Sequence, residues 1–295
     1  MGQTEQRLVE TADRITVALD RLLPRAQGPE ARLLSAMRYA ALGGGKRLRP
    51  FLLLEVGRIF DADEQALLRV AAAVECVHTF SLVHDDLPCM DDDDTRRGQP
   101  TVHVEFDEAT ALLAGDALLT FAFELLAEPA THPDPQMRAK LISGLAKATG
   151  PQGMIAGQAL DMAGREMGDD LIAITRMNRL KTGALINFSV EAGALLGCAP
   201  DDARHALQRY AHDVGLAFQL ADDLLDLQGR PDVTGKAVQK DAAAGKVNFV
   251  TVLGEGPARE RMRLLAAQAK GHLAIFGPRA KLLSEIVDFV MNRQH

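Results

Sequence analysis

Residues 201–228 read DDARHALQRYAHDVGLAFQLADDLLDLQ and have the periodicity of one long helix. At 100° per residue, Gln219, Asp222, Asp223 and Asp226 spread over about 100° and therefore share one face. The residues around them are mostly apolar, so this face is not simply the solvated side of an amphipathic helix. Three carboxylates on such a helix need metal ions or basic groups as partners.

A second acidic cluster reads HDDLPCMDDDDTRRG over residues 84–98. Asp85 and Asp91 would point about 120° apart on a straight helix. Pro88 should end or kink that helix, because it lacks a backbone N–H and clashes with the preceding turn. The chain can then bring Asp91 back beside Asp85. The aspartates at 92–94 are interpreted instead as a solvated acidic turn.

The two clusters together point to bound cations. Crowded carboxylates repel one another unless cations lie between them. Ligand sets made only of oxygen suit a hard cation, and Mg2+ usually completes its coordination with water and substrate phosphate. Upstream of the first cluster, His78, Ser81 and Asp85 follow i, i+3, i+7 spacing, so the histidine faces the same side as the aspartate. The sequence therefore indicates a pocket that holds a diphosphate through several metal ions.

Basic residues accompany the acidic ones. Residues 43–50, GGGKRLRP, form a glycine loop that leads into a helix with a proline near its first turn. Such a loop allows close approach to an anion, and arginine forks suit phosphate oxygens; a helix C-cap followed by surface basic residues is an equally good interpretation. Arg96 and Arg97 directly follow the first cluster. Lys181 lies in an apolar helical stretch, where Gly183 indicates a packing or kink role.

Composition excludes several classes of protein. Nucleic-acid binding is not favoured at a net charge of −7 and a pI of about 5.6. No apolar run looks long enough to span a bilayer, and the polar N-terminus does not resemble a signal peptide. Cysteines without metal-type spacing fit a reducing cytosol, so we expect a cytoplasmic protein without stable membrane insertion.

The rest of the chain also has helical periodicity, with no convincing alternating strand and no linker, which predicts a single all-α domain over residues 1–295. The stretch 228–256 has poor periodicity. It is either a disordered connector or a lid in which Lys236, Lys240 and Lys246 cover a phosphate. The expected helices span residues 3–24, 30–42, 50–60, 64–87, 103–127, 134–149, 152–165, 170–196, 201–228, 257–275 and 278–293.

Five ordered motifs carry a resemblance to a known family: GGGKRLRP, ECVHTFSLVHDDLPCMDDDDTRRG, GQALD, LKTG and FQLADDLLD. In this order and spacing, almost the whole chain resembles the bacterial trans-prenyltransferases of the farnesyl diphosphate synthase type. The resemblance implies an isoprenoid-synthase-like helical bundle around a deep central cavity, and a homodimer. It also implies an Mg2+-assisted condensation of isopentenyl diphosphate with an allylic diphosphate, dimethylallyl or geranyl diphosphate.

The resemblance further implies a role for each matching residue. About three Mg2+ ions would be held by Asp85, Asp86, Asp91, Asp222, Asp223 and Asp226, with Asp86 supporting. The allylic diphosphate would contact Arg96, Lys181 and Lys236. Isopentenyl diphosphate would contact Lys46, Arg49, His78 and Arg97. Thr182 and Gln219 would point oxygens at the developing cation.

Product length is assigned in this family to bulk just upstream of the first aspartate motif, here Phe80 and Ser81. An aromatic residue at the first of these positions resembles fifteen-carbon synthases, so farnesyl diphosphate is the expected product. Geranyl or geranylgeranyl diphosphate stays open, because Phe80 falls about 140° from Asp85 around an ideal helix.

Three other functions share part of this pattern. A terpene cyclase uses the same metals but needs no site for isopentenyl diphosphate. A non-catalytic prenyltransferase subunit would be expected to lose one aspartate cluster. A calcium- or phosphate-binding protein does not explain the large apolar content between the clusters. One departure from the family is Val-Asn-Phe-Val at residues 247–250, where a Thr-Tyr-Pro-like stretch is common; losing the proline permits a different helix start.

Overall fold

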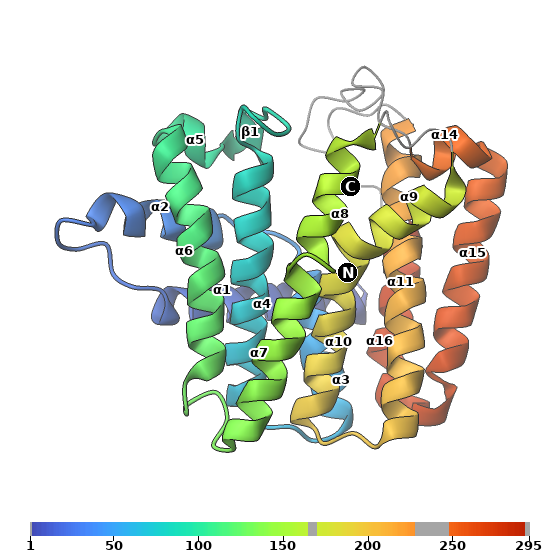
Figure 1. The fold of residues 1–295 in the computed structure, drawn as a ribbon. Coiled ribbons are helices and arrows are strands. Elements are labelled where there is room, and N and C mark those ends of the chain that lie inside the picture. The colour runs from blue at the N-terminus through green and yellow to red at the C-terminus, as the bar shows by residue number, and fades with distance from the viewer. Residues whose placement is uncertain (1, 165–169, 228–247, 293–295) are drawn as a thin grey trace. The chain divides into compact units, whose positions relative to one another are not determined.

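The computed structural model describes residues 2–164, 170–227 and 248–292, and the chain divides into two compact units. The N-terminal unit comprises residues 1–54 and 63–142; the C-terminal unit comprises residues 55–62 and 143–295. Most of the described residues are helical, as Figure 1 shows, and the described strands are two of two residues each, so the predicted all-α class is confirmed. The prediction of one domain over the whole chain stays a prediction.

The N-terminal unit is built around α4 and α6, which lie side by side. They approach closely where His84 of α4 meets Gly115 of α6, because a Cβ at Gly115 would lie 2.2 Å from His84 Nε2. The elements of this unit are α1 (Gln3–Leu22), α2 (Ala31–Leu42), α4 (Glu64–Asp85), β1 (Thr95–Arg96), β2 (Gln99–Pro100), α5 (Val102–Glu105) and α6 (Glu108–Ala127). Two further helices, α3 (Leu48–Ile59) and α7 (Pro135–Thr149), contribute residues to both units.

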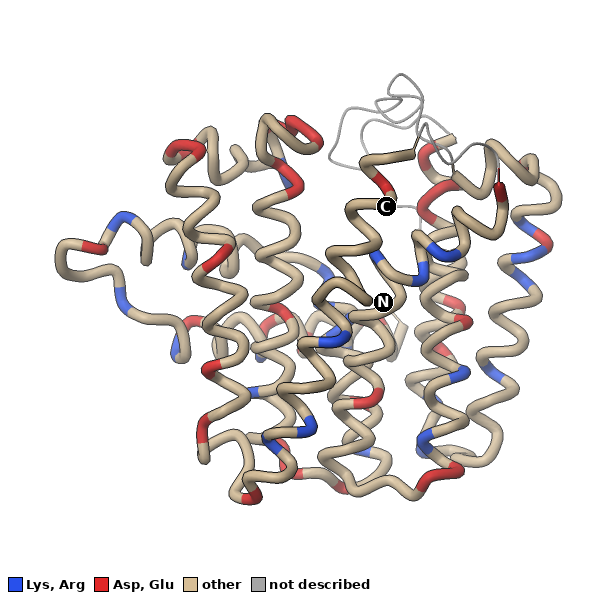
Figure 2. Tube along the Cα trace, in the orientation of Figure 1, with Lys and Arg blue, Asp and Glu red and all other residues tan. Residues whose placement is uncertain are grey.

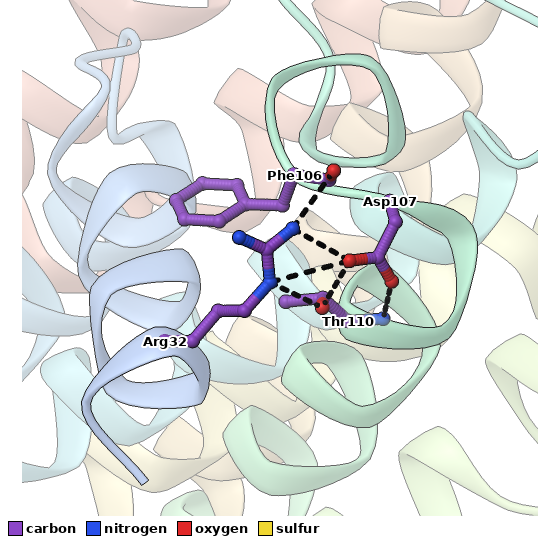
Figure 3. A network of polar contacts seen from close by, with 4 residues as sticks. All are labelled: Arg32, Phe106, Asp107 and Thr110. Atoms are coloured by element: carbon purple, nitrogen blue, oxygen red, sulfur yellow. Dashed lines mark hydrogen bonds and ion pairs between the residues drawn. The ribbon is translucent and has the colours of Figure 1, made fainter. Parts of the chain in front are cut away.

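The single helix expected over 103–127 is wrong, because the chain breaks at Phe106–Asp107 into α5 and α6. Asp107 caps α6: its Oδ1 accepts from the backbone N of Thr110 at 2.7 Å, and its Oδ2 accepts from Arg32 Nη2 at 2.6 Å. Arg32 Nη2 also donates to the Phe106 carbonyl at 2.9 Å (Figure 3). These bonds lower the pKa of Asp107 to about 2, with the backbone N–H as the first cause. An aspartate at the N-cap outweighs continued helical periodicity here.

Two described helices, α4 and α6, are long and apolar enough to cross a membrane by length and composition alone, which the sequence interpretation did not anticipate. In α4, 72% of the apolar window is buried inside the protein. A core helix of a folded domain passes the same test, so these helices do not indicate membrane insertion.

The C-terminal unit is organised around α11, which packs along α15. Its elements are α8 (Met154–Met162), α9 (Leu171–Asn178), the π-helix η2 (Arg179–Gly183), α10 (Ala184–Leu196), α11 (Asp201–Leu227), α14 (Phe249–Leu253), α15 (Glu255–His272), the 3-10 helix η3 (Ala274–Ala280) and α16 (Lys281–Asn292). Leu220 and Leu224 of α11 share an apolar core with Phe249 of α14 and Met262 of α15. Tyr210 is fully buried, and its hydroxyl donates to the Leu283 carbonyl at 2.8 Å.

Candidate active site

The first aspartate cluster forms the turn that Pro88 predicted. Helix α4 ends at Asp85, and the backbone N of Asp91 donates to the Asp85 carbonyl at 2.9 Å. That bond closes the turn and returns Asp91 to Asp85, as expected from the sequence. Both residues are partly exposed. Two carboxylates that belong to one short turn can therefore face solvent together.

Asp86 differs from its neighbour Asp85 because it is buried, with 3% of the residue exposed. The Arg96 guanidinium binds the Asp86 carboxylate through three hydrogen bonds. Nε donates to both carboxylate oxygens at 2.8 Å, and Nη2 donates to Oδ1 at 2.5 Å. Asp86 raises the pKa of Arg96 against the opposing effect of burial. The predicted support role of Asp86 thus has a physical basis, since its carboxylate fastens the turn through a charge pair.

The interpretation of residues 92–94 as a solvated turn is wrong for Asp93. Asp93 is buried, and its carboxylate lies 3.9 Å from Arg96 Nη2. Asp92 and Asp94 are exposed, as expected. The i, i+3 spacing of Asp93 and Arg96 is visible in the sequence. Whether the two side chains meet depends on the geometry of the turn, which the spacing does not give.

Arg97 connects this turn to the glycine loop. The turn continues into the two-residue ladder of β1 and β2, which the sequence interpretation missed. Arg97 Nη1 donates to the Gly44 carbonyl, and a Cβ at Gly45 would lie only 2.7 Å from Arg97 Cζ. Gly44 and Gly45 also have φ of +81° and +125°, which favour glycine. Gly45 therefore makes room for the Arg97 guanidinium, whereas a Cβ at Gly44 would meet nothing within 4 Å.

Several arginines act electrostatically on His78. Burial is the main cause that holds the pKa of His78 well below its usual range; Arg49, Arg97, Arg47 and Arg96 lower it further, in that order. These effects require residues far apart in sequence to lie near one another within the N-terminal unit. Three of the residues predicted for isopentenyl diphosphate, Arg49, His78 and Arg97, are thus brought together.

Arg47 was given no role from the sequence, and its contacts make it a structural residue. Its guanidinium is buried with Glu75: Nη1 donates to Glu75 Oε1 at 2.5 Å, and Nη2 donates to the Ala41 carbonyl at 2.7 Å. A buried pair of this kind fixes the loop before α3. Lys46, the remaining residue predicted for isopentenyl diphosphate, is exposed on the same loop.

The second aspartate cluster lies on the C-terminal end of α11, where Figure 2 shows acidic residues. Asp222 is partly exposed and Asp226 is exposed, but Asp223 is buried with 4% of the residue exposed. Burial raises the pKa of Asp223 to about 7, with Asp222 and Asp226 adding to the rise. Gln219 Nε2 donates to Asp223 Oδ1 at 2.8 Å, and the backbone N of Phe249 donates to Oδ2 at 2.9 Å.

Thr182 and Lys181 lie on the π-helix η2, which the sequence interpretation took as part of one helix over 170–196. Thr182 Oγ1 donates to Gln219 Oε1 at 3.3 Å, so these two predicted residues meet. The π-turn packs closely against α8, because a Cβ at Gly157 of α8 would lie 2.1 Å from the Lys181 backbone N. Gly215 of α11 also packs against the π-helix, its added Cβ 3.4 Å from the Gly183 Cα.

Asp161 is a site residue that sequence reasoning missed. Lys181 Nζ donates to Asp161 Oδ2 at 2.5 Å, and both side chains are largely buried. Its place in the GQALD motif was the available signal. Asp161 holds the lysine predicted to contact a diphosphate.

The remaining predicted residues are Phe80 and Ser81 of α4 and two lysines, Lys236 and Lys246. Phe80 is buried, and its ring meets the His84 ring edge-on at 4.9 Å between centroids. Ser81 Oγ donates to the His78 carbonyl at 2.9 Å. Lys236 and Lys246 lie outside the described residues. Within the described ranges, no three acidic, histidine or cysteine side chains are grouped closely enough to hold a metal ion by themselves.

A cavity of about 960 Å³ lies within the C-terminal unit and is lined by residues of α7, α10, α11 and α15. His205, Arg209 and His212 are among its walls. None of the site residues predicted from the sequence lines it.

Known proteins similar to this chain share one kind of activity. The family model described as polyprenyl synthetase matches residues 30–271. The chain is 43% identical to a farnesyl diphosphate synthase of Geobacillus stearothermophilus, over 99% of this chain and 98% of that protein. It is 37% identical to geranylgeranyl pyrophosphate synthase 4 of Arabidopsis thaliana, over 98% of this chain and 77% of that protein. The apo crystal structure of an FPP/GFPP synthase from Zymomonas mobilis has a TM-score of 0.88 and 45% identity, covering 98% of each chain.

The helical architecture is that of a prenyl synthase. The chain belongs to the polyprenyl synthetase family, and it is a prenyltransferase. The predicted family, fold and enzyme class are therefore confirmed.

Proposed function

We propose that this prenyltransferase condenses isopentenyl diphosphate with dimethylallyl or geranyl diphosphate and releases farnesyl diphosphate. The observation that carries the proposal is the contact between Arg97, which follows the aspartate turn, and the Gly44 carbonyl, because it brings the basic residues of the glycine loop to that turn. A site that only ionises one diphosphate, as in a terpene cyclase, does not need this second set of cations. The similarity to a farnesyl diphosphate synthase over nearly the full chain supports the same choice.

Mg2+ is the proposed cofactor, with about three ions per site. The donors fit it, since Asp85, Asp91, Asp222 and Asp226 offer only carboxylate oxygens and are at least partly exposed. A complete protein cage is not needed, because Mg2+ takes water and substrate phosphate oxygens as its other ligands. Bound Mg2+ would supply Lewis-acid stabilisation of the departing diphosphate.

The residues of the chain have separate roles in this proposal. Arg96, Lys181 and Lys236 contact the allylic diphosphate, and Asp161 holds Lys181 in place. Lys46, Arg49, His78 and Arg97 bind isopentenyl diphosphate. The oxygens of Thr182 and Gln219 face the allylic carbocation. The double bond of isopentenyl diphosphate attacks that cation head to tail, and the proton then lost goes to the diphosphate leaving group. The site must exclude water, which would convert the cation into an alcohol.

Product length depends in this proposal on Phe80, with Ser81 beside it. Phe80→Ala should allow growth beyond fifteen carbons if the ring limits the chain, whereas Ser81→Ala removes only a hydroxyl and should leave the product length unchanged. Chromatography of the dephosphorylated products separates these cases. An unchanged product from Phe80→Ala would remove this role, and geranyl or geranylgeranyl diphosphate as the main product would favour the alternatives.

We further propose a cytoplasmic homodimer. Helix α6 exposes Leu112 and Leu113 at 47% and 55%, an apolar surface that a second copy could cover. Light scattering of the purified protein measures the mass, and a monomer at micromolar concentration would contradict the dimer.

The test of the function is an incubation of purified protein with isopentenyl diphosphate, an allylic diphosphate and Mg2+, followed by chromatography. We expect farnesyl diphosphate to form with Mg2+, to stop with EDTA and to return when Mg2+ is added in excess. Turnover without a divalent metal would contradict the mechanism. Consumption of the allylic diphosphate without use of isopentenyl diphosphate would instead indicate a cyclase.

A further inference from the structure

Asp223 is the buried aspartate of the second cluster, and the protein binds both of its carboxylate oxygens. Its Oδ1 accepts from Gln219 Nε2 at 2.8 Å and its Oδ2 accepts from the Phe249 backbone N at 2.9 Å. The residue is 4% exposed, while Asp222 is partly exposed and Asp226 is exposed. Both oxygens of Asp223 are thus directed at donors inside the C-terminal unit.

The bond to Asp223 determines the orientation of the Gln219 side-chain amide. Both carboxylate oxygens of Asp223 act as acceptors, and the donor from Gln219 is Nε2, so the NH2 end of Gln219 faces Asp223. The carbonyl end then faces Thr182, whose hydroxyl donates to Gln219 Oε1 at 3.3 Å. One chain of hydrogen bonds therefore runs from the Phe249 N–H through Asp223 and Gln219 to Thr182.

The segment that supplies the Phe249 N–H is itself anchored. Phe249 is 1% exposed and packs in the apolar core with Leu220 and Leu224 of α11. Asn248 caps the start of α14, its side chain accepting from the Thr251 backbone N at 2.9 Å. This backbone N–H cannot rotate, so Asp223 has a fixed donor on one side and a rotatable amide on the other.

We propose that Asp223 is a positioning residue that orients the Gln219 amide, not a metal ligand. The inference rests on the proposed function, because it assigns the Gln219 oxygen to the site where the allylic cation forms. A carbonyl oxygen there stabilises positive charge, whereas an NH2 group would repel it. The identity of residue 223 thus determines whether Gln219 presents its oxygen or its NH2 group to the allylic cation.

The first variant is Asp223→Asn, which keeps the shape and removes one acceptor. The oxygen of the introduced asparagine should keep the fixed Phe249 N–H, which turns its NH2 toward Gln219. Gln219 must then flip and present its own NH2 toward Thr182. By analogy with the loss of one preorganised polar group, kcat should fall by about tenfold to a hundredfold. The KM for isopentenyl diphosphate and the Mg2+ concentration for half-maximal activity should not change.

The matched test exchanges the two groups in the double variant Gln219→Glu with Asp223→Asn. The introduced asparagine accepts from the Phe249 N–H and donates to the introduced glutamate. That glutamate also accepts from Thr182, so all three bonds are kept: the two outer bonds keep their direction, and only the bond between residues 219 and 223 reverses. Gln219→Glu alone places two carboxylates against each other and should be impaired. The exchange should recover most of the kcat lost in Asp223→Asn, a favourable coupling in the double-mutant cycle.

Several outcomes would overturn the inference. These are an unchanged kcat in Asp223→Asn, a raised Mg2+ requirement like that of the control Asp226→Asn, or no recovery in the exchange variant. If Asp223→Asn alone does not fold, the exchange variant still decides, since it conserves the whole bond chain.

Failure of the proposed function is seen separately, as a wild-type chain that transfers no prenyl group. Urea unfolding of the same variants then tests the inference without activity. Both single variants should be less stable than the wild type, and the exchange variant should regain stability. Additive losses in the double variant would show that the two side chains do not act through each other.

Discussion

The pairs Asp85-Asp86 and Asp222-Asp223 have the same sequence and the same pattern of burial, yet their buried members are held by different partners. In each pair the first aspartate is partly exposed and the second is buried. Asp86 is matched by the charge of Arg96, whereas Asp223 accepts from two uncharged N–H groups. Burial raises the pKa of Asp223 to about 7. Each Asp-Asp motif therefore combines a partly exposed aspartate with a buried one, and the partners of the buried aspartate differ between the two motifs.

The largest expected effect is on turnover, and it concerns the partly exposed aspartate of each pair. Asp85→Ala and Asp222→Ala should each lower turnover by about a thousandfold, because metal and diphosphate charge would no longer be matched. The rate of incorporation of isopentenyl diphosphate measures this. Asp94→Ala is the control for the first region, since its side chain is 83% exposed. Near-normal activity in both variants would remove the metal role from these residues.

The buried members should differ in their effect on stability. Asp86→Ala leaves Arg96 without its charge partner and should lower the free energy of unfolding by about 3 kcal/mol. Asp223→Ala leaves neutral donors unsatisfied and should cost about 1–3 kcal/mol. Urea unfolding at pH 7.5 compares them, with Asp94→Ala expected within about 0.5 kcal/mol of the wild type. A clearly larger loss of unfolding free energy in Asp223→Ala than in Asp86→Ala would contradict the expectation that the charge pair contributes more to stability.

A smaller effect should appear in the pH dependence of stability. Folded His78 stays neutral because its pKa is well below the usual range, whereas the unfolded chain takes up a proton near pH 6.5. The unfolded state therefore binds more protons as the pH falls, and His78 should cost about 1.4 kcal/mol of stability between pH 7.5 and pH 5.5.

The comparison with His78→Gln isolates this contribution, since the variant should lack it. The raised pKa values of Asp213 and Asp223 act in the opposite direction, because the folded protein then holds protons that the unfolded chain has lost. They are present in both proteins and cancel in the difference. Equal pH dependence in the wild type and the variant would show that the pKa of His78 is not lowered in the folded protein.

Most of the fold and the outline of the site could be predicted from the sequence. Helix α4 ends two residues before the predicted end, because the effect of Pro88 on the preceding turn is local. Helix periodicity located α11 to within one residue. The break before Asp107 was missed because an N-cap and continued periodicity compete, and the contact with Arg32, 75 residues away, decides between them.

The sequence could not predict which aspartate of each pair is buried. That depends on contacts made through the tertiary fold: Arg96 returns to Asp86 only because the turn closes, and Phe249 reaches Asp223 only because α14 packs on α11. The close packing of the π-helix at Lys181 against Gly157 of α8 is likewise a tertiary contact. Periodicity describes the elements, but the division of roles follows from how they pack.

Calorimetric titration of inorganic diphosphate, in the presence of Mg2+, into Asp222→Asn and Asp223→Asn separates the two roles within one motif. These neighbours lie on one helix and differ in burial, and the carboxylate of the buried Asp223 accepts from Gln219 and Phe249. We expect Asp222→Asn to lose Mg2+-dependent binding and Asp223→Asn to bind with the wild-type affinity. An equal loss in both variants would show that the buried aspartate also holds the metal, and the division of roles would be wrong.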